Sequence, residues 1–507
     1  MSEYLKEERA QEWRETLRKS VKTKERVSIP RGKMPEVDPV VRSRSYDEVN
    51  LGLTVELAVN ESHRCLDCVD PTCISGCPVE INIPKFIKNI ERGEFLEAAK
   101  TLKETSALPA VCGRVCPQER QCESQCFYRL KLKKEPVAIG HLERFAADYE
   151  RLSGNISIPE TAPSNGIKIA VVGSGPAGLA FAGDMVKLGY DVTVFEALHE
   201  LGGVLRYGIP EFRLPNDIVD IEIDGLRKMG VQFETNCIVG KTISQEDLKA
   251  DGFKAIFVGS GAGLPNFMNI PGENLIGVMS CNEYLTRVNL MQAADPESDT
   301  PVYKGKRVAV VGGGNTAMDA VRTARRLGAE RAMIIYRRSE EEMPARVEEI
   351  KHAKEEGIEF YTLHNPLRYE GDERGRVQKM LLQRMELGTP DQSGRRRPVP
   401  IEGDTAWLEV DEVIVSVGVS PNPLIPQTFD GLEVTTWGTI VVNSDTMQTA
   451  DEMIFAGGDI VRGGATVILA MGDGRKAAKA MDQHLSDRMI ERFDDESTHQ
   501  HISKSTD

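Results

Sequence analysis

The chain has 507 residues, of which 40% are hydrophobic and 28% charged, so its composition is neither disordered nor fibrous and its length predicts about three domains. The net charge of −15 and the isoelectric point near 5.3 argue against nucleic acid or an anionic membrane as the main partner. No apolar run is long enough to span a membrane, and the charged N-terminus lacks an apolar signal core, so we expect a cytoplasmic protein.

The N-terminal part of the chain, 1–160, predicts a helical domain organised around cysteines. We expect a helix over about residues 3–20, then an extended arm that contains three prolines, and a second helix near 46–60. Beyond residue 61 the cysteines alternate with amphipathic segments, and residues 137–152 have the apolar spacing of a further helix. The turn-rich segment 153–166 marks the end of this domain.

From residue 167 onward, a strand–turn–helix–strand pattern occurs twice. The first copy has an apolar strand at 167–172, a glycine-rich turn, a helix ending near Leu188 and a second strand. In the second copy, at 306–338, Gly312 has the place that Gly173 has in the first. Three further short apolar strands end in glycine, at 255–261, 412–418 and 453–459. The polar C-terminal end of the chain suggests a helix end followed by a loose tail.

The first glycine-rich turn predicts a dinucleotide site. Its glycines would allow a tight turn, close approach of a pyrophosphate to the backbone, and close packing of the helix on the strand. Glu196 ends the second strand, at the distance from the turn where a carboxylate can accept hydrogen bonds from both ribose hydroxyls. The residues of this turn are Gly173, Ser174, Gly175, Pro176, Ala177 and Gly178.

The second glycine-rich turn predicts a site for NADPH. No acid stands at the end of its second strand, where Arg337 and Arg338 occur instead. Guanidinium groups pair with a 2′-phosphate that a carboxylate would repel, which favours NADPH over NADH. The alternative is simply an exposed basic strand end. The residues of this turn are Gly312, Gly313, Gly314, Asn315, Thr316 and Ala317.

Two dinucleotide units predict an α/β architecture like that of flavin disulfide reductases, with FAD in the first Rossmann-like domain and NADPH in a second domain inserted into it. We expect Asp459, after Gly458, to bind the ribityl chain, the helix start at Thr466 and Val467 to face the flavin ring, and Gly203 to contact the flavin. No C-x-x-C lies between the units, which disfavours disulfide reduction. The expected domains are 1–160 (helical), 161–300 (FAD, first part), 301–440 (NADPH) and 441–507 (FAD, second part, and tail).

Eight of the ten cysteines lie between Cys65 and Cys126, a distribution that indicates metal ligation in a reducing compartment. Their spacing is C-x2-C-x4-C-x3-C-P in the first group and C-x3-C-P-x4-C-x3-C in the second. It is closer to two-cluster ferredoxins than to the paired knuckles of structural zinc. We therefore expect two [4Fe–4S] clusters, with zinc or incidental cysteines as alternatives. The candidate ligands are Cys65, Cys68, Cys73, Cys77, Cys112, Cys116, Cys122 and Cys126.

Several segments together resemble the small (beta) subunit of NADPH-dependent glutamate synthase. They include RCLDCVDPTCISGCPVEINIPKFI, CGRVCPQERQCESQC, VVGSGPAGLAFA, LGGVLRYGIPEFRLP, VVGGGNTAMDAVRTARRLGA and YRRSEEEMPAR. The flavin–iron–sulfur subunit of the bifurcating NADH-dependent ferredoxin:NADP oxidoreductase and the N-terminal half of dihydropyrimidine dehydrogenase are similar. The resemblance covers about residues 40–485, and the long N-terminal arm and Cys112 depart from it.

The resemblance implies hydride transfer from NADPH to FAD, then single electrons through the clusters to an acceptor, with no side chain acting as general acid or base, so we name no catalytic residue. In the resembled enzyme the acceptor is a large subunit that makes glutamate from glutamine and 2-oxoglutarate. Ser2 stands where its amidotransferase nucleophile would be an N-terminal cysteine, so we expect no glutamate synthesis by this chain alone.

Two other functions remain open at this point. The chain could belong to a bifurcating oxidoreductase, with a smaller FAD/[2Fe–2S] subunit as partner and ferredoxin as acceptor. It could also be a scaffold that has lost its cofactors, although the intact glycine motifs, Arg337 and Arg338 argue against this. The cofactor motifs are common to the first two functions and do not separate them. No function in this group involves nucleic acid or a membrane.

The resemblance also implies a non-cysteine ligand for one cluster. Alignment on IGHLERFA places Glu143 there, although an acid on a helix is as often a solvated side chain. The expected sets are Cys65, Cys68, Cys73 and Cys126 for one cluster, and Cys77, Cys116, Cys122 and Glu143 for the other. Cys112 is then spare, or competes with Glu143 as fourth ligand.

Overall fold

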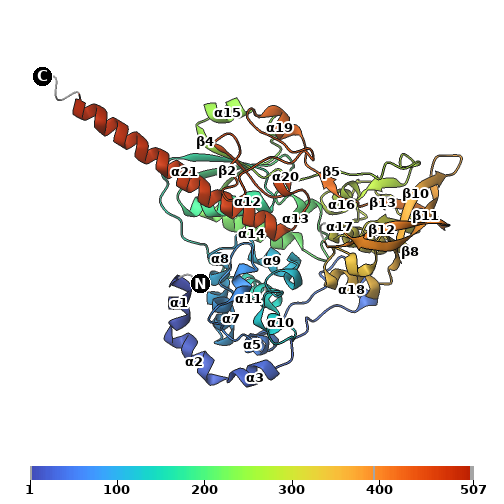
Figure 1. The fold of residues 1–507 in the computed structure, drawn as a ribbon, viewed down its shortest axis with the longest axis horizontal. Helices are drawn as coiled ribbons and strands as arrows, with labels where there is room; N and C mark the ends of the chain where they lie inside the picture. The colour runs from blue at the N-terminus through green and yellow to red at the C-terminus, as the bar shows by residue number, and fades with distance from the viewer. Residues whose placement is uncertain (1–2, 392–393, 503–507) are drawn as a thin grey trace.

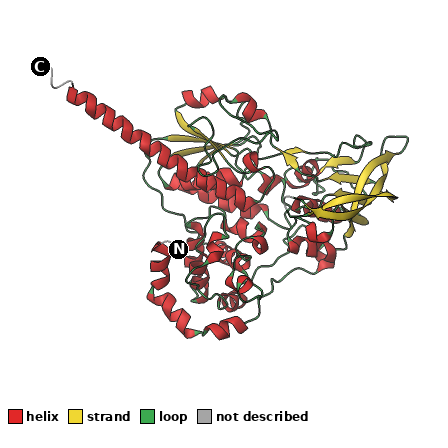
Figure 2. Ribbon diagram, in the orientation of Figure 1, coloured by secondary structure: helices red, strands yellow, loops and turns green. Residues whose placement is uncertain are grey.

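The computed structural model describes residues 3–391 and 394–502, with residues 489–502 described by their backbone alone. It has an all-helical module at the N-terminus and two α/β modules, each with its own parallel sheet (Figures 1 and 2). The predicted fold class is therefore confirmed. Within the described part, no helix is long and apolar enough to cross a membrane.

The helical module contains more and shorter helices than the sequence predicts. The expected helix over 3–20 is two helices, because Gln11 adopts an extended backbone conformation between them, and the helix expected near 46–60 begins only at Val55. The Thr54 Oγ1 accepts the Leu57 N–H at 3.2 Å and caps that helix. Its helices are α1 (Glu3–Ala10), α2 (Glu12–Ser20), α3 (Thr23–Ser28), α4 (Pro39–Arg42), α5 (Val55–Ser62), α6 (Thr72–Ser75), α7 (Ile83–Glu91), α8 (Phe95–Lys103), α9 (Pro109–Val115), η1 (Gln118–Arg120), α10 (Phe127–Leu130) and α11 (Ile139–Ser153).

Helices α9 and α11 cross closely at Gly113, where a Cβ atom would lie 2.5 Å from the backbone nitrogen of Arg144. An added methyl group would force one of the two helix backbones to shift. Gly113→Ala is therefore expected to lower the free energy of unfolding by about 1–3 kcal/mol. Gly225→Ala is the matched control, because Gly225 is also inside a helix and nothing lies within 4 Å of its Cβ position. That control should be neutral or slightly stabilising. Urea unfolding followed by circular dichroism measures both; equal effects would contradict the close packing.

The first α/β module is built on a parallel sheet of order β15-β4-β1-β2-β3. The strand β15 returns to this sheet from the far end of the chain, so the second module is an insertion in the first. Helix α21 packs on α12 and extends to Ile502, so the expected loose tail is helical up to that residue, and the remainder lies outside the described residues. The elements are β1 (Lys168–Val172), α12 (Pro176–Lys187), β2 (Asp191–Phe195), α13 (Val204–Tyr207), α14 (Asn216–Met229), β3 (Gln232–Glu234), α15 (Gln245–Ala250), β4 (Phe253–Val258), α19 (Leu424–Thr428), β15 (Ile454–Ala456), α20 (Asp459–Arg462) and α21 (Val467–Ile502).

The second α/β module has a parallel sheet of order β6-β13-β7-β8-β9 and an antiparallel sheet, β10-β11-β12, that the sequence analysis did not anticipate. Its first strand, β6, precedes the boundary expected at residue 301, because β6 pairs with β13 and not with the first sheet. A two-stranded ladder, β5 with β14, joins the modules. The elements are β5 (Leu264–Pro265), β6 (Val278–Ser280), α16 (Cys281–Asn289), β7 (Arg307–Val311), α17 (Asn315–Arg326), β8 (Arg331–Tyr336), η2 (Glu340–Glu342), α18 (Val347–Glu355), β9 (Glu359–Thr362), β10 (His364–Gly371), β11 (Val377–Pro390), β12 (Arg396–Glu409), β13 (Glu412–Val415) and β14 (Val419–Ser420).

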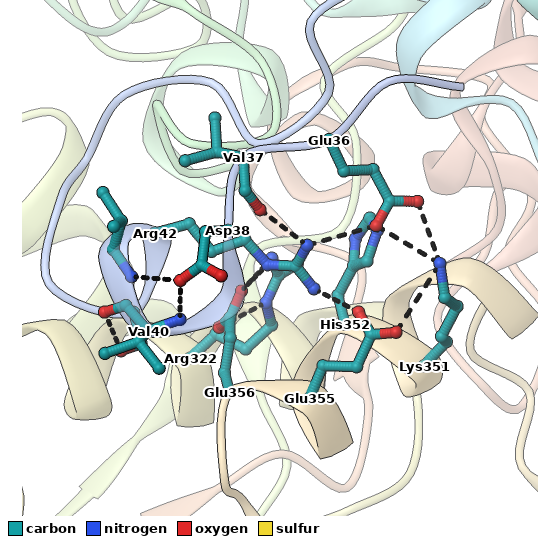
Figure 3. Close-up of polar contacts among 12 residues, drawn as sticks. Glu36, Val37, Asp38, Val40, Arg42, Arg322, Lys351, His352, Glu355 and Glu356 are labelled. Carbon is teal, nitrogen blue, oxygen red and sulfur yellow. Dashed lines mark hydrogen bonds and ion pairs between the residues drawn. The ribbon is translucent and has the colours of Figure 1, made fainter. Parts of the chain in front are cut away.

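The arm between α3 and α5, expected to be extended, contains the short helix α4 and fastens the helical module to the second α/β module (Figure 3). Arg42 is 1% exposed and reaches the end of α18, where it donates to Glu355 at 2.5 Å and to Glu356 at 3.2 Å. Arg322 and Arg326 of α17 share the same Glu356 carboxylate. Since a buried carboxylate is stable only when paired, this shared acid fixes the arm, α17 and α18 relative to one another.

Candidate functional site

One cavity of about 2430 Å³ lies between the two α/β modules and is lined by parts of both glycine-rich turns. Three residues of the turns, Ser174, Gly178 and Ala317, are not in its lining. The other predicted cofactor residues do line it: Gly173, Gly175, Pro176, Ala177, Glu196, Gly203, Gly312, Gly313, Gly314, Asn315, Thr316, Arg337, Arg338, Gly458, Asp459, Thr466 and Val467.

The first turn has the close approach that its glycines predict. Gly173 has a φ of +96°, and a Cβ at Gly178 would lie 2.0 Å from the Gly173 carbonyl oxygen. Helix α12 begins at Pro176 directly after this turn, so its free N–H groups point at the cavity. Nothing lies within 4 Å of the Cβ position of Gly175, which leaves the backbone there open to a pyrophosphate.

Glu196 lies at the end of β2 beside that turn and is 6% exposed. Its carboxylate accepts the Ser174 N–H at 2.9 Å and the Ser174 hydroxyl at 2.6 Å, and its other oxygen accepts the Leu198 N–H at 2.9 Å. The acid is therefore held in one orientation at the cavity wall. This preorganisation suits recognition of a ribose diol.

The starts of α20 and α21 also line the cavity, close to the first turn. Gly458 has a φ of +78°, and a Cβ there would approach Ala177 to 2.9 Å, so this turn abuts the first one. Burial raises the pKa of Asp459 to about 6, and the Ala465 N–H donates to its carboxylate at 3.1 Å. Tyr207 lines the same region, and burial, then Asp459, raise its pKa to about 12. The motif LGGVLRYG contains Tyr207, but no pattern in the sequence selected it.

The second turn repeats this geometry at the N-terminus of α17. A Cβ at Gly312 would lie 2.3 Å from the Ser416 carbonyl oxygen, and one at Gly313 would lie 2.7 Å from the Tyr336 ring. The Asn315 side chain accepts the Arg346 N–H at 2.9 Å, which fixes the start of the helix. The turn can therefore present its N–H groups to a phosphate.

The two arginines after β8 have different environments. Arg337 is exposed at the rim of the cavity. Arg338 is 8% exposed and is held by Asp391 at 2.9 Å and by the Arg396 carbonyl oxygen at 2.8 Å. From the sequence, we expected both side chains to bind the coenzyme. In the structure, Arg338 is already paired with Asp391. Arg337 does not share this carboxylate and is the better candidate to bind the coenzyme phosphate.

The cysteines of the helical module form two neighbouring groups. Burial raises the pKa of Cys73 well above its usual range, and the nearby thiols of Cys65, Cys126 and Cys68 raise it further. The pKa of Cys68 is raised to about 12 by burial and by Cys65 and Cys126. These four sulfurs share one environment, and it is the set expected for the first cluster.

The second group surrounds Glu143. Burial raises the pKa of Cys77 to about 12, with Glu143 and Cys112 contributing. The hydrogen bond with Cys112, then burial, raises the pKa of Cys116, and burial raises that of Cys122; Glu143 contributes to both. Glu143 is 5% exposed, its Oε1 has no hydrogen-bond partner among the described residues, and burial, then Glu222, raise its pKa to about 8. A buried carboxylate oxygen that has no partner and lies among thiols suits a metal site.

The spacing of the sulfurs fits a polynuclear cluster better than zinc. Four thiolates about 2.3 Å from one zinc ion would lie about 3.8 Å apart. Among the described residues, no three cysteine sulfurs lie within 4.8 Å of one another. The groups are therefore too wide for a single ion, and buried thiols of raised pKa need a cationic centre to become thiolates.

Three potential ligands that do lie within 4.8 Å of one another are Glu36, His352 and Glu355. Cations already occupy this place: Arg42 donates to Glu36 at 3.1 Å and Lys351 to Glu36 at 2.9 Å (Figure 3). Hydrogen bonding to His352 is the largest cause that lowers the pKa of Glu36. We interpret this cluster as the ion-pair network of the arm and not as a metal site.

The second cysteine group contacts α21, the helix whose first residue, Val467, lines the cavity. The Sγ of Cys112 lies 3.5 Å from the Sδ of Met471 in α21. A Cβ at Gly472 would lie 2.9 Å from the carbonyl oxygen of Pro78, the residue after Cys77. This group is therefore joined through α21 to the cavity. The contact is long-range in sequence, and no local pattern predicts it.

Family comparisons agree with this division. Residues 42–155 match the family described as dihydropyrimidine dehydrogenase domain II, 4Fe-4S cluster, and residues 167–481 match the pyridine nucleotide-disulphide oxidoreductase family. The first match ends where the helical module ends, and the second includes both α/β modules.

Individual relatives cover most of the chain. The glutamate synthase [NADPH] small chain of Azospirillum brasilense is 36% identical over 456 residues, covering 89% of this chain and 94% of the relative. The subunit beta of the NADP(+)-dependent formate dehydrogenase of Moorella thermoacetica is 38% identical over 441 residues, covering 82% of this chain and 60% of the relative. Among solved structures, Mycobacterium tuberculosis FprA in complex with NADPH has a TM-score of 0.53 at 19% identity, covering 65% of this chain and 86% of that one, which supports the fold alone.

Proposed function

Because this chain belongs to the family of flavin–iron–sulfur oxidoreductase subunits that includes the glutamate synthase small chains, we propose that it oxidises NADPH and delivers the electrons to a partner. The electrons pass through FAD and two [4Fe–4S] clusters to a large subunit that makes glutamate from glutamine and 2-oxoglutarate. The observation that carries this proposal is the cavity that both glycine-rich turns share.

The first turn, Glu196, Asp459 and the start of α21 would hold FAD, and the second turn and Arg337 would hold NADPH. A flavin supplies the conversion of a hydride into single electrons. The residues of this chain bind and orient: helix N-termini face the phosphates, and Glu196 is fixed by Ser174. No side chain has to move a proton in this scheme, so none is assigned a catalytic role.

We assign Cys65, Cys68, Cys73 and Cys126 to one cluster and Cys77, Cys116, Cys122 and Glu143 to the other. The mutual pKa effects support the division into two groups, with Cys112 in the second, and the unpartnered Glu143 oxygen supports the carboxylate ligand. Cys112 is spare in this assignment, or competes with Glu143 as fourth ligand, because its sulfur lies beside Cys116 as well as Met471. The cluster that contains Cys77 is the one joined to the flavin end of the cavity through α21.

The identity of the electron-accepting partner is the most specific part of the proposal. The formate dehydrogenase subunit beta of Moorella thermoacetica resembles 82% of this chain. A similar flavin–iron–sulfur subunit therefore occurs in enzymes with other electron donors or acceptors. A bifurcating oxidoreductase subunit is the second candidate function. Identification of the protein that copurifies with the chain separates the two, because one partner is a large glutamine-using subunit and the other a smaller flavin/[2Fe–2S] protein.

The isolated chain is expected to bleach its flavin on anaerobic addition of NADPH and to form no glutamate from glutamine and 2-oxoglutarate. Absorbance at the flavin band and an amino-acid assay measure the two results. Addition of the large subunit should restore glutamate formation. Glutamate made by the pure chain, or a flavin that NADPH leaves oxidised, would contradict the proposed function.

A further inference from the structure

Three arginines of the N-terminal helices converge on one buried aspartate. Arg9 donates to the Asp67 carbonyl oxygen at 2.8 Å, Arg18 donates to the Asp67 carboxylate at 2.6 Å, and Arg14 pairs with the same carboxylate. Asp67 is fully buried and Arg14 is 2% exposed. The helices α1 and α2 that carry these arginines lie outside the family match, which begins at residue 42.

Asp67 lies inside the first cysteine pair, Cys65-Leu66-Asp67-Cys68. Its φ of +50° is left-handed, a conformation that a side-chain anchor can hold in place. The Asp67 backbone N–H donates a hydrogen bond to the Cys65 sulfur. The arginines therefore hold in place the loop that carries the sulfurs of Cys65 and Cys68 and the N–H that bonds to the Cys65 sulfur.

Two further cations lie on the other side of Cys65. The Lys88 Nζ donates to the Cys65 carbonyl oxygen at 2.7 Å and Arg26 donates to it at 3.5 Å, and both pair with Glu91. The cations around this loop therefore outnumber the two carboxylates, Asp67 and Glu91, that they contact. Near the second cysteine group lie the carboxylate of Glu222 and the buried guanidinium of Arg346, while Glu143 is one of the proposed ligands.

We propose that the N-terminal helices raise the reduction potential of the cluster at Cys65, Cys68, Cys73 and Cys126, through Arg14 and Arg18 as positioning residues. Such an effect would direct electrons from the cluster beside α21 toward this one. The inference rests on the proposed function, because it requires the two clusters assigned above.

The physical reason is charge. Adding one electron to a cluster adds one negative charge and makes or breaks no bond, so an excess of buried cations stabilises the reduced form. The hydrogen bond to the Cys65 sulfur acts in the same direction. Around the second group, the carboxylate of Glu222 is accompanied by Arg346, so no comparable excess of cations acts there and the two clusters should differ in potential.

The test is an EPR-monitored redox titration of the reconstituted full chain with chemical mediators, which needs neither NADPH nor a partner. In the double variant Arg14→Gln/Arg18→Gln, the reduced-to-oxidised ratio of the cluster that contains Cys65 should fall at least about tenfold at a fixed potential. This fall corresponds to a midpoint potential lower by about 59 mV for a one-electron couple. The other cluster should be unchanged. The matched control is Lys19→Gln/Lys24→Gln, which removes two exposed charges from the same segment and should shift neither cluster.

The lysine variants Arg14→Lys/Arg18→Lys keep the charge and should retain most of the potential. An unchanged midpoint at full iron content in the glutamine variant, or an equal shift in the control, would overturn the proposal. If the double variant loses iron, the single variant Arg18→Gln, at a side chain 19% exposed, decides the question by a smaller shift in the same direction. Absence of iron–sulfur signals in the unaltered chain would instead refute the proposed function.

Discussion

Replacing Arg337 by glutamine is expected to lower kcat/KM for NADPH at least tenfold and to leave kcat/KM for NADH nearly unchanged. Arg337 is exposed at the cavity rim beyond β8, where the 2′-phosphate of a bound coenzyme would lie. A hydrogen bond to a charged group contributes roughly 1.5–3 kcal/mol, which corresponds to at least a factor of ten. Ferricyanide reduction with each coenzyme measures the two values.

Arg338→Gln is expected to change coenzyme preference less, because Asp391 already pairs with Arg338. Arg374→Gln is the matched control, since Arg374 is an exposed arginine in the turn after β10 and does not line the cavity. Its kinetics should equal those of the unaltered enzyme. Equal kcat/KM for NADPH and NADH in the unaltered enzyme would show that the arginine pair was wrongly assigned.

Replacing Glu143 by alanine is expected to change the EPR spectrum of one cluster or to remove about four irons per chain, because its carboxylate is the proposed fourth ligand. Replacing Cys112 by alanine should keep all of the iron, because Glu143 and not Cys112 is the proposed fourth ligand. The double variant Glu143→Ala/Cys112→Ala should lose about four irons, since no fifth donor remains to compensate.

Iron per chain after anaerobic reconstitution, together with the reduced EPR spectrum, measures all three variants. The two single variants make a direct comparison, because each removes one buried donor from the same group of thiols. If Cys112→Ala loses about four irons while Glu143→Ala keeps its iron and an unchanged spectrum, the cluster has four cysteine ligands.

Local elements were the most predictable part of the fold. The strands β1 and β7 and the helices α12 and α17 occur close to where the glycine-rich turns placed them, because strand, turn and helix N-terminus are encoded within about a dozen residues. The predicted helix over 137–152 is α11, at Ile139–Ser153, where Gly154 ends it in a left-handed conformation.

Long-range pairings were not predictable. The strand β6 joined the second sheet through β13, which lies far later in the chain, and the antiparallel sheet β10-β11-β12 had no signal that distinguished it. The sequence also could not tell Arg337 from Arg338, because the difference is the distant Asp391. Each of these features depends on contacts between residues that are far apart in the sequence. Composition and the spacing of neighbouring residues do not reveal such contacts.

By itself, the sequence determined the two glycine-rich turns, the absence of a redox C-x-x-C between them, and the cysteine spacing that indicates iron–sulfur clusters. These features are short, and their chemistry requires particular residues at fixed separations. Only the tertiary structure decided that both turns face one cavity, that Glu143 lies among four thiols, and that Arg14 and Arg18 hold Asp67. Those arrangements arise because a buried charge or hydrogen-bonding group is stable only beside a partner, and the partner comes from whichever distant segment packs against it.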